Sequence, residues 1–78
     1  MFNVYPNPAS GTIYINSNTA ISKNVFVNVI NDLGQIVKTI KYESLQNGRI
    51  DIGKFPAGVY TINIRTESGE ENKIVILN

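Results

Sequence analysis

Six carboxylates, seven basic side chains and a scatter of hydroxyl groups are the side chains that could perform acid–base or nucleophilic chemistry in this 78-residue sequence. The sequence contains no histidine and no cysteine. It therefore lacks the commonest general acid or base and the thiolate nucleophile. A serine nucleophile would need a positioned base, and no serine has a lysine three residues later. We therefore expect no catalytic residue and no enzymatic activity.

The carboxylates do not follow the spacing of a metal site or a glycosidase site. A calcium loop needs several oxygen ligands at alternate positions, and no such run is present. Glu67, Glu70 and Glu71 flank a predicted hairpin tip, where solvated charges are the simplest interpretation. Asp32 lies at a predicted turn, where its carboxylate can accept hydrogen bonds from backbone N–H groups. The sequence predicts no bound metal and no cofactor.

Charge and hydrophobicity exclude two further classes of partner. The net charge is +1 and the basic residues are scattered, whereas a nucleic-acid-binding domain usually shows a basic patch or stripe. No apolar run approaches the ~20 residues that span a bilayer. We expect no nucleic-acid partner and no direct membrane insertion.

Alternation of apolar and polar residues predicts β-strands along the whole chain. In the clearest case, Tyr60, Ile62 and Ile64 share one face of a strand. Turn residues separate the runs about every ten residues, which is typical of a sandwich or a barrel. The predicted strands are a short one before Asn7, then Thr12–Asn16, Asn24–Ile30, Gln35–Tyr42, Arg49–Ile52, Gly58–Arg65 and Lys73–Leu77.

Some of these assignments had a competing interpretation. Gln35–Tyr42 also fits a helical spacing, but its β-branched and aromatic residues favour a strand. Asn31–Gly34, Asn47–Gly48 and Glu67–Glu70 are predicted turns. Tyr14 and Phe26 lie opposite the aliphatic faces of their strands, so one sheet could present an aromatic ring outward, as sugar-binding surfaces do. We favour the simpler interpretation that both faces are partly packed.

Four segments together resemble a known family. They are Val4–Ala9 (VYPNPA), Val29–Val37 (VINDLGQIV), Phe55–Tyr60 (FPAGVY), and Gly69 followed by Lys73–Val75 (KIV). In this order and spacing they are similar to the type A C-terminal sorting domain of cargo proteins of the type IX secretion system of Bacteroidetes. The resemblance covers essentially the whole chain.

The resemblance implies an immunoglobulin-like antiparallel β-sandwich of about seven strands. It implies that residues 1–78 are a single C-terminal sorting domain, a fragment of a larger secreted protein with an N-terminal cargo. Such a domain directs its cargo through the periplasm to the outer-membrane translocon, and a surface sortase then removes it and can attach the cargo to a lipopolysaccharide anchor. The implied destination is the medium or the cell surface.

The resemblance also assigns roles to residues. The expected sorting and recognition residues are Gly58, Tyr60, Gly69, Lys73, Ile74 and Val75. The expected structural residues are Pro6, Asn7 and Pro8 in the opening turn, and Asp32 and Gly34 in the central hairpin. The chain departs from the family where Phe55 replaces a frequent leucine and where a second lysine near the end is missing.

Two hypotheses about recognition remain open from the sequence. A terminal strand at a sheet edge could pair with a partner by strand addition. The alternative function is an immunoglobulin-like spacer or a carbohydrate-binding module of an extracellular enzyme.

Overall fold

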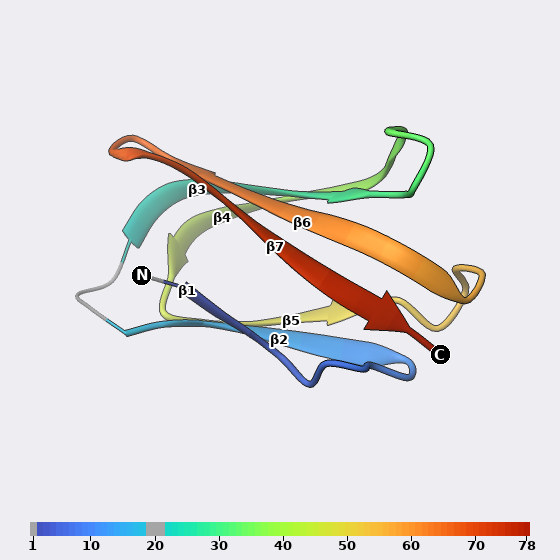
Figure 1. Cartoon of the computed structure of the whole chain (residues 1–78). Helices are drawn as coiled ribbons and strands as arrows, with labels where there is room; N and C mark the ends of the chain where they lie inside the picture. The colour runs from blue at the N-terminus through green and yellow to red at the C-terminus, as the bar shows by residue number, and fades with distance from the viewer. Residues whose placement is uncertain (1, 19–21) are drawn as a thin grey trace.

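The computed structural model describes residues 2–18 and 22–78 and shows two antiparallel β-sheets packed face to face (Figure 1). The all-β prediction is confirmed, and the ambiguous segment Gln35–Tyr42 falls almost wholly in a strand. The strands are β1 (Phe2–Tyr5), β2 (Thr12–Ser17), β3 (Ser22–Ile30), β4 (Ile36–Leu45), β5 (Asn47–Asp51), β6 (Gly58–Thr66) and β7 (Gly69–Leu77).

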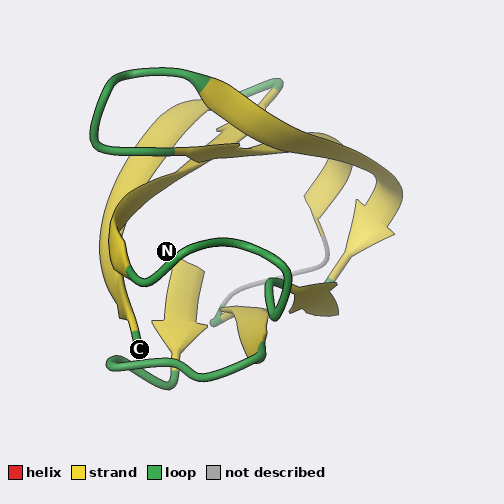
Figure 2. Ribbon diagram, turned by 90° about the vertical axis from the view of Figure 1, so that its right-hand side faces the viewer, coloured by secondary structure: helices red, strands yellow, loops and turns green. Residues whose placement is uncertain are grey.

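The two sheets form the two layers of a sandwich (Figure 2). One sheet has the strand order β1-β2-β5 and the other has the order β4-β3-β6-β7. In a constant-type immunoglobulin domain the fourth strand joins the sheet of the first, second and fifth. Here the fourth strand pairs with the third instead, so the immunoglobulin-like sandwich is present with one edge strand moved to the opposite sheet.

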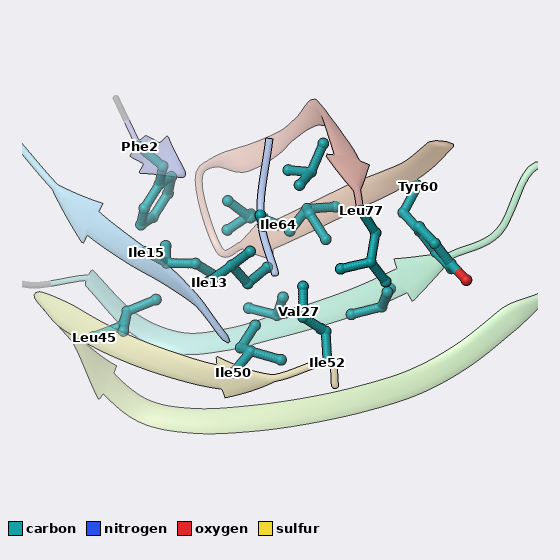
Figure 3. Packing of buried hydrophobic residues seen from close by; sticks show 14 of the residues in the cluster. Phe2, Ile13, Ile15, Val27, Leu45, Ile50, Ile52, Tyr60, Ile64 and Leu77 are labelled. Carbon is teal, nitrogen blue, oxygen red and sulfur yellow. The ribbon is translucent and has the colours of Figure 1, made fainter. Parts of the chain in front are cut away.

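The core lies between the sheets and is filled by alternate residues of the strands (Figure 3). Val25, Val27 and Val29 of β3 and Ile62 and Ile64 of β6 are each at most 1% exposed, as the alternation predicted. The other buried apolar residues are Phe2, Ala9, Ile13, Ile15, Leu45, Ile50, Ile52, Tyr60, Val75 and Leu77.

Two turns are tighter than the sequence indicated. Asn47–Gly48 belongs to strand β5 rather than to a turn, and Gln46 alone separates β4 from β5. Gly69–Glu70 belongs to β7, so the last hairpin turns at Glu67–Ser68. In both places the backbone ladder extends further than side-chain type suggested, because pairing with a neighbouring strand outweighs local turn propensity.

Side chains join β4 to β5 along one side of the sandwich. The Tyr42 hydroxyl donates to the carbonyl of Arg49 at 3.3 Å, and Lys38 Nζ donates to the carbonyl of Asp51 at 3.4 Å. A Cβ atom at Gly48 would lie 3.1 Å from the Tyr42 oxygen, so glycine allows the ring to approach the strand. Burial raises the pKa of Tyr42.

The two ends of the chain lie at opposite ends of the sandwich (Figure 1). Phe2 lies beside the β6–β7 hairpin, whereas the C-terminal end of β7 lies near the opening turn. The described residues contain no helix that could cross a bilayer.

Candidate functional site: the last strand and the outer face of its sheet

The free edge of β7 is occupied by the opening turn of the same chain. Asn7 Nδ2 donates to the carbonyl of Ile74 at 3.1 Å, and the Ile76 amide donates to Asn7 Oδ1 at 2.9 Å. The Ala9 amide donates to the Ile76 carbonyl at 2.8 Å, and the Asn78 amide donates to the Ala9 carbonyl at 2.9 Å. We call this arrangement the β7 seal. Strand addition along Ile74–Asn78 therefore finds the backbone groups already paired.

The predicted residue Lys73 lies where the chain begins. Its Nζ atom is 3.9 Å from Glu71 Oε1, and Glu71 Oε2 accepts a hydrogen bond from the Phe2 amide at 3.2 Å. The Lys73 and Glu71 side chains are 39% and 30% exposed. Glu71 also lines a hollow of about 150 Å³ between Phe2 and the β6–β7 hairpin. Lys73 thus accompanies the carboxylate that ties the last strand to the first.

Tyr60 and Val75, two of the expected recognition residues, belong to the core. Val75 is 2% exposed and Tyr60 is 7% exposed. The Tyr60 hydroxyl donates to the carbonyl of Pro56 at 2.6 Å, and its ring stacks on Phe55 with 6.1 Å between centroids. This is the arrangement of the tyrosine corner of immunoglobulin-like domains, in which a strand tyrosine bonds to the backbone a few residues upstream.

The central hairpin loop is organised by Asn31, not by Asp32. Asn31 Oδ1 accepts hydrogen bonds from the amides of Leu33 at 3.0 Å and Gln35 at 2.9 Å. Asp32 is exposed, and its carboxylate accepts no hydrogen bond from any residue that the structure describes. The prediction that Asp32 caps the turn is wrong by one position. Gly34 has φ +81°, a conformation that glycine adopts without strain.

The remaining predicted residues lie at strand ends and in the opening turn. Gly58 and Gly69 begin β6 and β7 with φ of +156° and +142°. Pro6 and Pro8 are exposed on either side of Asn7, and the peptide bonds preceding both prolines are cis. The structure therefore brings Asn7 together with Ile74, and it pairs Gly58 with Leu77 in the same half of β7, whereas Gly69 lies at the other end of that strand.

An exposed aliphatic surface crosses the outer face of the four-stranded sheet. Strand register aligns Ile36 with Ile30, Ile30 with Thr61, and Thr61 with Ile74, while Val59 pairs with Ile76 in the next row. Ile74 is 65% exposed and Ile36 is 60% exposed. We call this surface the aliphatic band, and its members are Ile30, Ile36, Val59, Ile74 and Ile76.

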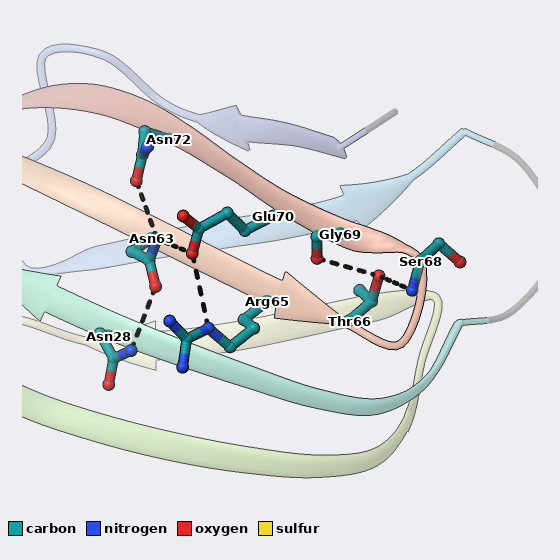
Figure 4. A network of polar contacts seen from close by, with 8 residues as sticks. All are labelled: Asn28, Asn63, Arg65, Thr66, Ser68, Gly69, Glu70 and Asn72. Atoms are coloured by element: carbon teal, nitrogen blue, oxygen red, sulfur yellow. Dashed lines mark hydrogen bonds and ion pairs between the residues drawn. The ribbon is translucent and has the colours of Figure 1, made fainter.

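A row of asparagines crosses this face (Figure 4). Strand register places it next to the aliphatic band. Thr39 Oγ1 donates to Asn28 Oδ1 at 2.8 Å, and Asn28 Nδ2 donates to Asn63 Oδ1 at 3.2 Å. Asn63 Nδ2 in turn donates to Asn72 Oδ1 at 2.9 Å. This row, the asparagine ladder, links β4, β3, β6 and β7 through side chains.

Beyond the ladder the face becomes charged. Lys41 Nζ lies 5.8 Å from the centroid of the Phe26 ring, and Arg65 Nε lies 3.5 Å from Glu70 Oε2. Hydrogen bonding from Asn63 and the nearby charge of Arg65 hold the pKa of Glu70 below its usual value. The outer face is thus divided into aliphatic, amide and charged rows.

Sequence reasoning found Ile74 but not its neighbours in the aliphatic band. The signal was present in the last strand, where Ile74 and Ile76 alternate with the buried Val75 and Leu77. When a strand is apolar on both faces and the core covers only one of them, the other face is left exposed to solvent. Val59 and Ile36 become part of the aliphatic band only through strand pairing, which cannot be read from the sequence.

The described residues offer little else that could form a chemical site. Among them, no three acidic side chains lie close enough together to hold a metal ion. Ile74 of the Lys73–Val75 motif belongs to both the aliphatic band and the β7 seal, whereas Lys73 lies beside Glu71 and Val75 lies in the core.

Comparison with known proteins gives the family. No curated protein matches the chain. Residues 3–78 match the family model described as the secretion system C-terminal sorting domain, which covers the opening turn, both sheets and the last strand. The chain therefore belongs to this family, the C-terminal sorting domains of type IX secretion.

Proposed function

We propose that residues 1–78 form the C-terminal sorting domain of a larger secreted protein and carry its N-terminal cargo from the periplasm through the outer-membrane type IX translocon. A surface sortase then cuts the domain from its cargo. The observation that carries this proposal is the family match over residues 3–78. The immunoglobulin-like spacer or carbohydrate-binding module that the sequence left open receives no such support.

The aliphatic band is the surface through which the translocon recognises the folded domain. A small soluble domain rarely exposes a contiguous aliphatic patch without an interaction that uses it. Ile74 brings the C-terminal motif into this band and Ile76 extends it, whereas Val75 and Tyr60 act indirectly by shaping the sheet below. Burying one isoleucine contributes about 1.5–3 kcal/mol, so a few such contacts suffice for a transient complex.

The position of the chain ends suits this role. The chain enters at Phe2, beside the β6–β7 hairpin, while Ile74 and Ile76 lie in the second half of β7 toward the opposite end (Figure 1). A folded cargo before Phe2 would extend away from the aliphatic band.

The experiment fuses residues 1–78 to the C-terminus of a periplasmic reporter in a cell with a working type IX system. We expect the reporter at the surface or in the medium, and a cut near the fusion point. A reporter that stays in the periplasm although the domain is folded would contradict the proposal.

Matched variants locate the surface that is read. Ile74→Thr with Ile76→Thr keeps β-branched side chains, and therefore strand propensity, while removing apolar area. We expect this pair to fold and to lose export. The control is Phe26→Thr, which removes an aromatic ring that is 40% exposed at the charged end of the same face and should leave export unchanged. If Ile74→Thr with Ile76→Thr is exported as well as Phe26→Thr, the aliphatic band is not the surface that the translocon recognises.

A further inference from the structure

The outer face of the three-stranded sheet carries a row of two tyrosines and an arginine. Tyr5 pairs with Tyr14, and Tyr14 pairs with Arg49, so the three side chains cross β1, β2 and β5 side by side. The two rings are stacked, with 5.7 Å between centroids and 27° between planes. They are 48% and 42% exposed. We call these three residues the tyrosine row.

An amide row runs beside the tyrosine row. Asn3 pairs with Asn16, and Asn16 pairs with Asn47. Asn16 Nδ2 donates to Asn47 Oδ1 at 2.6 Å. This bond leaves Asn16 Oδ1 and Asn47 Nδ2 without a protein partner among the described residues, so one acceptor and one donor stay available to a ligand.

Positive charge gathers on the other side of the tyrosine row. Arg49 Nε lies 3.3 Å from Asp51 Oδ1, and this carboxylate also accepts a longer hydrogen bond, 3.5 Å, from Thr12. Lys38 and Lys54 line a hollow of about 440 Å³ next to Asp51, at the side of the sandwich where β4 meets β5. Lys38 reaches it from the larger sheet, and its Nζ donates to the Asp51 carbonyl at 3.4 Å. Neither lysine lies within ion-pair distance of a carboxylate of the described residues, so Asp51 is the one acidic group facing three cations.

We propose that this face binds an acidic polysaccharide, with sugar rings on the tyrosine row and carboxylate groups at the lysine-lined hollow. An aromatic ring carries negative charge on its face, which suits the weakly positive C–H groups on the flat side of a pyranose. Hydroxyl groups of the sugar can bond to the open amide groups of Asn16 and Asn47. Arg49, Lys38 and Lys54 supply the charge complementarity that favours an acidic polymer over a neutral one.

The spacing supports a polymer rather than a single sugar. Arg49 and Asp51 are two residues apart on β5, which places the tyrosine row and the hollow about 7 Å apart along the strand. Consecutive units of a chain would reach both.

The site stands apart from the proposed sorting surface. The tyrosine row lies on the three-stranded sheet and the aliphatic band on the outer face of the four-stranded sheet. Lys38 belongs to β4 of the larger sheet, but it pairs with the buried Val29 and therefore lies on the side away from the aliphatic band. Export can therefore succeed where polysaccharide binding fails, and the reverse, so the two proposals are tested separately.

The test titrates the 78-residue chain, followed by NMR, with alginate, a polymer of uronic acids, and with the neutral polymer dextran. We expect alginate to shift the signals of Tyr5, Tyr14 and Arg49 and to bind more tightly than dextran. Tyr14→Ala should weaken alginate binding about tenfold, the upper end of what one aromatic contact contributes. Lys38→Gln with Lys54→Gln should remove the preference for alginate while weak dextran binding remains.

The controls make the outcomes decisive. Phe26→Ala removes a ring of similar exposure from the opposite sheet and should leave binding unchanged. If Tyr14→Ala unfolds the chain, two other measurements take its place. They are the binding of alginate by Tyr5→Ala and the map of NMR shifts that alginate causes in the unaltered chain. No binding to alginate, shifts elsewhere on the molecule, or equal binding to polyaspartate, which has charge but no sugar ring, would each overturn the proposal.

Discussion

Tyr60 shows how a residue of the family motif acts without being reached by a partner. Its ring fills the core, and its hydroxyl fixes the chain just before β6 through the Pro56 carbonyl. This hydrogen bond ties β6 to the loop that precedes it. Under the proposed function, Tyr60 would support export indirectly, by holding the sheet that displays Ile74 and Ile76.

Replacing Tyr60 by phenylalanine tests this role. We expect Y60F to lower the free energy of unfolding by about 1 kcal/mol, the usual net contribution of one hydrogen bond. Urea denaturation followed by circular dichroism measures it. Tyr14→Phe is the control, since the Tyr14 ring is exposed and its change should stay within about 0.5 kcal/mol. Equal stability of Y60F and the unaltered chain would remove the structural role of the hydroxyl.

At the scale of single residues, the type of a residue did not suffice to predict its role, because its neighbours in the fold determine that role. Asp32 and Asn31 have similar turn chemistry, and only the path of the loop selects the Asn31 oxygen as the acceptor. Asn47–Gly48 carries a strong turn signal, yet Gly48 lies in a strand where it makes room for Tyr42. That need arises from a side chain on another strand, which no local pattern reveals.

The sandwich elements were largely predictable, because each strand shows its buried face as a period-two alternation. The rows across strands were not. The aliphatic band, the asparagine ladder and the tyrosine row depend on strand order and register. Those are fixed when two sheets close over one core. The occupied edge of β7 was unpredictable for the same reason, since Asn7 and Ile76 are 69 residues apart.

The β7 seal makes a prediction about Asn7. Asn7→Ala removes two hydrogen bonds to β7 and should lower the free energy of unfolding by about 1–2 kcal/mol. The Ile76 amide should also exchange its proton faster than in the unaltered chain, as hydrogen exchange by NMR would show. Asn3→Ala is the matched control, because Asn3 is exposed on β1 and should leave that amide protected. Unchanged exchange at Ile76 in N7A would refute the seal.

The charged row predicts that the free energy of unfolding depends on pH. Because the pKa of Glu70 is lower in the folded chain than in the unfolded chain, its ionised form stabilises the fold. This contribution is fully present above the unfolded value of 4.5 and is lost as the pH falls through the lower folded value. Glu70→Gln should therefore lose less stability between neutral and acid pH. Its exposed side chain keeps the effect small.

Denaturation curves at several pH values between 7 and about 3 check this effect, with the range chosen around ordinary carboxyl values. Glu43→Gln serves as control, because Glu43 is exposed on β4. The same acid dependence in E70Q, E43Q and the unaltered chain would mean that Asn63 and Arg65 do not hold the Glu70 carboxylate.

At the scale of the whole molecule, we expect removal of the last strand to unfold the domain. Deleting Ile74–Asn78 takes Val75 and Leu77 out of the core and leaves Asn7 and Ala9 without partners. Emptying one large core position costs about 2–5 kcal/mol. The total stability expected for a small domain is about 5–15 kcal/mol.

We therefore expect the chain ending at Lys73 to be unfolded, with collapsed dispersion in its NMR spectrum. Loss of export by such a truncated chain would then result from unfolding, and it would not show that a recognition surface had been removed. The surface pair Ile74→Thr and Ile76→Thr separates the two. A folded, well-dispersed spectrum of the truncated chain would show that the last strand is an appendage.

The β7 seal also determines what a protease leaves behind. A cut before Phe2 keeps Asn7 and Ala9 on the domain, so the released piece retains the paired edge of β7. A cut after Ala9 would strip that cover and leave an aliphatic strand with open backbone groups, the kind of edge from which proteins aggregate. The position of a single cleavage thus determines whether the edge of β7 on the released domain is paired or open to aggregation.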